Sequence, residues 1–115
     1  MNFSAQTNLI HLNTTIKSLF DDSDRCSAEG DDSLAVSYYD DANELIKAGQ
    51  LVRQNKIDEL SSFIDEMDTM IREYAVCAFN EDLGAEFVRN SLGYEVAVGV
   101  CLLYTSPSPR DSDSS

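Results

Sequence analysis

One run of apolar residues, between Ile57 and Ala78, constrains the fold more than any other part of the sequence. Its members recur at alternating gaps of three and four residues: Ile57, Leu60, Ile64, Met67, Ile71, Tyr74 and Ala78. A strand alternates every two residues, whereas an α-helix brings residues with these gaps onto one face. A second row widens this face and consists of Phe63, Met70 and Cys77. We therefore predict a helix over residues 57–79, roughly 35 Å long at about 1.5 Å per residue.

The predicted helix has one candidate break, at Asp68 and Thr69. Aspartate favours the position before the first turn of a helix, where its carboxylate accepts hydrogen bonds from free backbone amides. The apolar face nevertheless keeps its phase across these two residues. We therefore expect one continuous helix, capped at its start by Asn55.

Upstream, the sequence predicts two helices joined by an acidic loop. Residues 3–20 carry leucine and isoleucine at helical spacing, with Thr7 or Asn8 as the cap, and residues 34–54 form the second helix. Residues 21–33 offer no apolar side chain larger than alanine or cysteine, so we expect a solvated loop there. On the second helix, the residues expected to face inward are Val36, Tyr39, Ala42, Ile46 and Leu51.

Downstream, residues 80–84 are predicted to form a turn and residues 85–91 a short helix that ends at Gly93. Residues 94–100 alternate and are rich in valine, which is typical of a strand. A single strand lacks a hydrogen-bonding partner, so we expect that partner to lie further along the natural chain. The predicted fold is all-α, a small bundle of three to four helices with a truncated C-terminal strand and a disordered tail.

The C-terminal tail has an unusual sequence. Residues 101–111 read Cys-Leu-Leu-Tyr-Thr-Ser-Pro-Ser-Pro-Arg-Asp. This run resembles, residue for residue, the translation of an adapter used in transposase-based sequencing libraries, although its composition alone would also suit a natural linker. The resemblance implies that residues 101–115 are not native and that the natural C-terminus is missing. Residues 1–100 then form a single small acidic helical domain or an N-terminal fragment.

The charge of the chain excludes several classes of partner. The formal net charge is −13, and it becomes −12 without the tail, which holds Arg110, Asp111 and Asp113. Phosphate backbones and anionic membrane surfaces would be repelled, so we expect no nucleic acid and no membrane as partner. We see neither a signal peptide nor an apolar run of about 20 residues. Cys26 and Cys77 are expected as free thiols, which favours a cytoplasmic, reducing location.

The sequence offers little for catalysis or metal binding. His11 is the only histidine, so a zinc site or a catalytic triad would depend on this one residue. The acidic loop departs from the calcium-binding pattern at Cys26, Ser27 and Ser33. Carboxylate pairs such as Asp65 with Asp68 are expected on the solvent side of the long helix. We therefore expect no enzyme activity, no cofactor and no metal.

These features favour an acidic helical module that binds another protein without catalysing a reaction. We expect its partner to be basic and steered by acidic rims, or to be a second copy that exchanges a helix. Such chains resemble small accessory proteins of viruses or microbes. Two alternatives remain, the N-terminal part of a larger enzyme and a nucleic-acid mimic that inhibits a DNA-binding protein. The expected partner-binding residues, here called the apolar ridge, are Ile57, Leu60, Phe63, Ile64, Met67, Met70, Ile71 and Tyr74.

Overall fold

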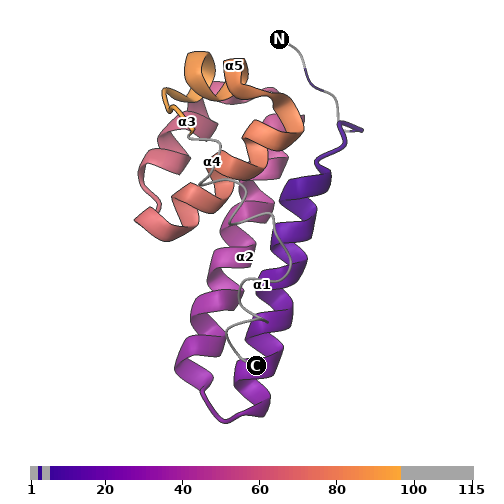
Figure 1. The fold of residues 1–115 in the computed structure, drawn as a ribbon, viewed down its shortest axis with the longest axis vertical. Coiled ribbons are helices and arrows are strands. Elements are labelled where there is room, and N and C mark those ends of the chain that lie inside the picture. Colours follow the sequence, from indigo (N-terminus) through magenta and orange to yellow (C-terminus); the bar gives the residue numbers. More distant parts are fainter. Residues whose placement is uncertain (1–2, 4–5, 97–115) are drawn as a thin grey trace.

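The computed structural model describes residues 3 and 6–96, and these form helices and connections without a strand. Two long antiparallel helices make a hairpin, and the remaining helices pack against the half of the hairpin that holds its two outer ends (Figure 1). The predicted all-α class is confirmed. Residues 94–96 are not in a strand, and the rest of the predicted strand and tail lies outside the described residues. The elements are α1 (Ile10–Ala28), α2 (Asp32–Arg53), α3 (Ile57–Asp65), α4 (Thr69–Leu83), α5 (Ala85–Phe87) and the π-helical turn η1 (Val88–Leu92).

Helix α1 continues through most of the segment expected to be a loop, so that prediction is wrong. The apolar face of α1 extends at helical spacing into Ser23 and Cys26, and both side chains are buried against α2. The Ser23 hydroxyl donates a hydrogen bond to the Ala35 carbonyl oxygen at 2.7 Å, which satisfies a polar group inside this interface. The connection between α1 and α2 is therefore only residues 29–31, and Asp31 caps α2 by accepting from the Leu34 amide at 3.2 Å.

Helix α2 buries a different face from the one predicted. Ala42 and Leu51 are buried as expected, but Val36 and Tyr39 are 58% and 53% exposed. The buried face includes several small residues instead, which let the two helices approach closely. At Gly49 an added Cβ would lie only 3.0 Å from Leu12 Cδ2. The residues of this face are Ala35, Tyr38, Ala42, Leu45, Gly49 and Val52, with Tyr38 partly buried.

The predicted continuous helix is broken into α3 and α4, so the expectation of continuity is wrong. Asp65 and Glu66 place negative charge at the C-terminal end of α3, where the helix dipole disfavours it. Asp68 has an extended backbone, with φ −60° and ψ 152°, and precedes the first turn of α4. The break lets α4 fold back, so that Met67 and Ile71 are both buried although they lie on opposite sides of the corner.

Helix α4 is the central element of the packed half and extends to Leu83, past the start of the turn expected at 80–84. Its residues 75–79 are buried in succession, because α4 contacts α1, α2, α3 and the α5–η1 segment. Cys77 is buried as expected but is disulfide-bonded, so the expectation of two free thiols holds only for Cys26. Phe79 and Phe87 pack with ring centroids 6.2 Å apart and anchor the short helical segment against α4.

The start of α1 is capped by a distant residue rather than by Thr7 or Asn8. Leu9 occupies the cap position and makes no side-chain hydrogen bond there. The Asp82 carboxylate, from the last turn of α4, accepts hydrogen bonds from the amides of His11 at 2.8 Å and Leu12 at 2.9 Å. This carboxylate also lies 3.0 Å from His11 Nδ1, and its side chain is only 3% exposed. Asp82 thus joins α4 to α1.

Asn55 does not cap α3 as predicted. It has a left-handed backbone with φ 58° between α2 and α3, and Lys56 occupies the cap position. The Asn55 side-chain amide instead pairs with the backbone N–H and carbonyl of Phe3. The Phe3 ring packs edge-on against Phe87, with centroids 5.5 Å apart. Gly93 follows η1 in the left-handed conformation, with φ 81°, which confirms its predicted helix-ending role.

Candidate protein-binding groove

The apolar ridge is divided between the core and the surface. Its central members are buried in the core that α3 and α4 share with the hairpin, so they hold the fold together in this structure. Among its remaining members, Ile57, Phe63 and Tyr74 are partly buried and Met70 is 49% exposed. The buried members are Leu60, Ile64, Met67 and Ile71. The ridge therefore does not present one continuous docking face.

A groove with acidic walls lies between α2 and α3, and we call it the α2–α3 groove. It consists of two adjoining depressions of about 550 Å³ and about 450 Å³. Lys47 and Phe63 line both depressions and thus stand at their junction. The first depression is lined also by Ser37, Asp40, Asp41, Asn43, Glu44 and Asp68, and the second by Leu51, Asp58, Glu59, Ser62 and Glu66.

Carboxylates crowd one another in the larger depression. Partial burial raises the pKa of the Asp41 carboxyl, and the neighbouring carboxylates of Asp68 and Asp40 raise it further. Burial also raises the pKa of Glu44, with smaller contributions from Asp41, Asp68 and Asp40. Both shifts mean that the ionised forms are disfavoured by desolvation and by like charge. A cation placed in this depression would relieve that repulsion.

The break between α3 and α4 creates this crowding. Asp68 belongs to the corner that precedes α4, and the corner brings its carboxylate beside Asp41 and Glu44 of α2. In a continuous helix Asp68 would follow the axis of α3 instead. The residue that marks the break in the sequence therefore also supplies one wall of the groove.

Lys47 is the only lysine or arginine among the described residues that line the groove. Its Nζ lies 5.1 Å from the centroid of the Phe63 ring, which is a cation–π contact. The Lys47 side chain is exposed, whereas Phe63 is partly buried. The groove thus combines acidic walls with an aromatic ring on which a cation already rests.

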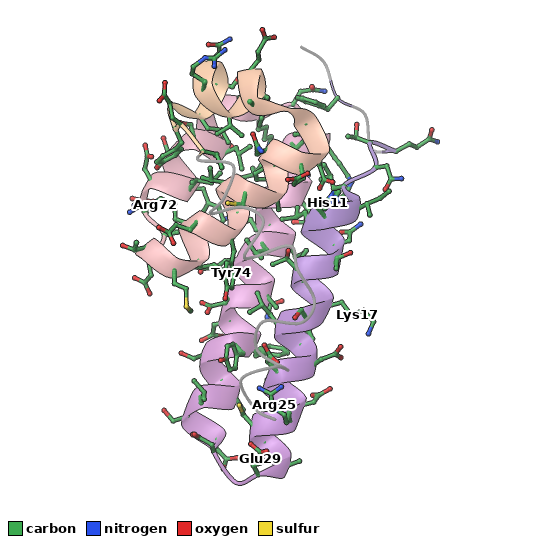
Figure 2. The ribbon with its side chains drawn as sticks, in the orientation of Figure 1. His11, Lys17, Arg25, Glu29, Arg72 and Tyr74 are labelled. Carbon is green, nitrogen blue, oxygen red and sulfur yellow. The ribbon has the colours of Figure 1, made fainter. Side chains whose placement is uncertain are left out.

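The other groups that the sequence singled out serve the fold. His11 is partly exposed and lies beside Asp82 at the start of α1, where α4 approaches (Figure 2). Asp65 accepts a hydrogen bond from the Tyr94 hydroxyl rather than pairing with Asp68. Among residues 3 and 6–96, no three His, Cys, Asp or Glu side chains gather so that they could hold a metal ion. Over the same residues, no helix has the length and apolar character needed to cross a membrane.

Phe63 was predicted from the sequence as a partner-binding residue, but the residues of α2 that face it were not. Asp40, Asp41, Glu44 and Lys47 line the groove from α2, and none of them is among the partner-binding residues predicted from the sequence. The available signal was their spacing, because Asp40, Glu44 and Lys47 recur at gaps of four and three residues and share one helix face. Nothing in the sequence showed that α3 lies beside that face.

Comparison of the chain with protein-family models, curated proteins and solved structures found no match. The interpretation of the groove therefore rests on its own geometry and charge.

Proposed function

We propose that this protein is a non-catalytic interaction module that binds a basic segment of another protein in the α2–α3 groove. The observation that supports this most is the charge of the groove walls. Four carboxylates line the larger depression and three line the smaller one, against the single cation of Lys47. Of the partner-binding residues proposed from the sequence, this proposal keeps Phe63, and it adds the acidic face of α2.

The charge of the whole chain favours a foreign partner over a second copy. Two copies would each carry a formal net charge of −13, and their acidic grooves would repel one another. A segment rich in arginine or lysine would meet complementary charge, which speeds association and selects the partner. Because the groove is open to solvent, we expect a transient complex whose affinity falls as salt screens the charges.

The test is a binding titration with a fluorescein-labelled peptide of alternating arginine and alanine, with the matched glutamine–alanine peptide as negative control. Fluorescence anisotropy reports Kd at low and at physiological salt. The Asp41→Asn/Glu44→Gln variant removes two charges from the groove, and we expect it to weaken binding about three- to tenfold. Because both carboxyl groups are disfavoured as anions, this variant should remain folded, so weaker binding would not reflect unfolding.

The matched control is Asp24→Asn/Glu29→Gln, which removes the same two kinds of charge at the tip of the hairpin. Both residues are exposed, and Glu29 lies at the end of the molecule away from α3 and α4 (Figure 2). We expect this control to change Kd by less than twofold. Equal weakening in both variants would mean that the peptide responds to net charge alone, and it would refute the groove as the site.

A further inference from the structure

The contact between Lys47 and Phe63 is unusual because the lysine is surrounded by carboxylates and yet pairs with none of them. Within the part of the chain that the structure describes, Lys17 forms an ion pair with Asp21 and Arg25 forms one with Asp22. Lys47 instead places its Nζ over the ring of Phe63, at the junction of the two depressions. The aromatic ring thus holds the one cation of the groove.

We propose that Lys47 is a built-in competitor, which occupies the face of Phe63 that an arginine of the partner takes on binding. This inference rests on the proposed function, since it specifies how a basic segment enters the same groove. The lysine is exposed and has a long flexible stem, so it can leave the ring without disturbing the helix. A cation–π contact at an exposed site is weak, and displacing it lowers the partner's affinity by about two- to fivefold.

The same contact gives the groove a preference for arginine over lysine in its partner. A lysine of the partner would only replace one ammonium group by another on the ring. A guanidinium group is planar and less strongly hydrated, and it stacks on aromatic faces better than an ammonium group does. An arginine of the partner therefore displaces Lys47 from the ring more readily than a lysine does. We expect the arginine–alanine peptide to bind more tightly than a lysine–alanine peptide of equal charge and length.

A double-mutant cycle tests the competitor and separates it from simple charge repulsion. The variants are Lys47→Gln, Phe63→Leu and their combination, titrated with the arginine–alanine peptide. If Lys47 competes for the ring, Lys47→Gln tightens binding by about two- to fivefold more when residue 63 is phenylalanine than when it is leucine. If Lys47 acts only through its charge, the gain is the same in both backgrounds, and the proposal is overturned.

Two further variants make the result independent of folding and of net charge. Lys47→Arg keeps the charge and strengthens the stacking, so the competitor predicts weaker peptide binding, and tighter or unchanged binding would contradict it. Lys17→Gln removes a lysine that points away from the bundle on the outer side of α1 (Figure 2), and it gives the effect of net charge alone.

The failure of this inference is distinguishable from the failure of the proposed function. If Asp41→Asn/Glu44→Gln weakens binding while the cycle shows no coupling, the groove is the site and Lys47 is not a competitor. If neither Asp41→Asn/Glu44→Gln nor Lys47→Gln changes the affinity, the groove is not the site and both proposals fall.

Discussion

Replacing Asp82 by alanine should destabilise the protein more than replacing any exposed aspartate. Its carboxylate accepts from the amides of His11 and Leu12 at 2.8 and 2.9 Å, and the side chain is 3% exposed. A hydrogen bond to a charged group contributes about 1.5–3 kcal/mol, and a helix cap about 0.5–2 kcal/mol. Because one carboxylate serves both amides, these contributions overlap, and we expect a loss of about 3 kcal/mol. A small domain is stable by only about 5–15 kcal/mol, so this loss is large.

Urea unfolding followed by circular dichroism at the helical band measures the free energy of unfolding of each variant. Asp82→Asn keeps one acceptor oxygen without the charge, and we expect about half the loss seen for alanine. His11→Ala removes only a partly exposed ring, so it should cost under about 1 kcal/mol. Asp21→Ala is the matched control, because Asp21 is an exposed acid that pairs with Lys17, and it should stay within about 0.5 kcal/mol of wild type. If Asp82→Ala also stayed within that margin, the capping of α1 by α4 would not contribute to stability.

Three other changes test the packing of the hairpin and the crowding of the groove. Gly49→Val should lower the free energy of unfolding by about 1–3 kcal/mol, because its Cβ would lie 3.0 Å from Leu12. Valine at the exposed neighbour Gln50 should lower it by under about 0.5 kcal/mol, and equal losses in urea unfolding would contradict close packing. Ser23→Ala should cost about 1 kcal/mol by the same measurement, with exposed Ser27→Ala as control, and no difference between them would show that the bond to Ala35 is unimportant. In the folded state the carboxyl pKa values of Asp41 and Glu44 are raised above their ordinary 3.8 and 4.5. Between the ordinary and the raised values the folded state therefore binds more protons than the unfolded state, and wild-type stability falls as the pH rises through this range. Asp41→Asn/Glu44→Gln should therefore be more stable than wild type at neutral pH and should lose this advantage at pH values below both ordinary pKa values. A variant that is less stable than wild type at neutral pH would disprove the crowding.

The apolar spacing between Ile57 and Ala78 was sufficient to predict the helical class, because gaps of three and four residues have no use in a strand. It did not settle the break, since α3 and α4 keep the same phase on either side of Asp68. The break depends on where α3 and α4 can pack against the α1–α2 hairpin, which is a property of the whole fold.

The errors in the hairpin share one physical cause, which is that its interface includes small and polar residues beside its leucines. Ser23 and Ala35 occupy core positions that a search for large apolar side chains passes over. Because Val36 and Tyr39 are large and apolar, the prediction placed the wrong face of α2 in the core. Small residues let the helices approach closely, as Gly49 does beside Leu12, so the spacing of the buried positions was a better guide than the size of their side chains.

The groove and the cap could not be predicted because both join residues that are far apart in the chain. Asp82 reaches His11 across 71 positions, and no local pattern connects them. Asp68 meets Asp41 only because the chain turns between α3 and α4. The acidic composition indicated a basic partner, but the place of binding required the tertiary structure.

The most direct test of the proposed function is a two-dimensional ¹H–¹⁵N spectrum of the protein, recorded as the arginine–alanine peptide is added. If the α2–α3 groove is the site, the backbone amides that shift most belong to residues 40–47 and 58–66, and the shifts saturate together. If the shifts instead spread over the acidic surface, including Asp24 and Glu29 at the hairpin tip, the peptide binds without a defined site and the central claim is wrong.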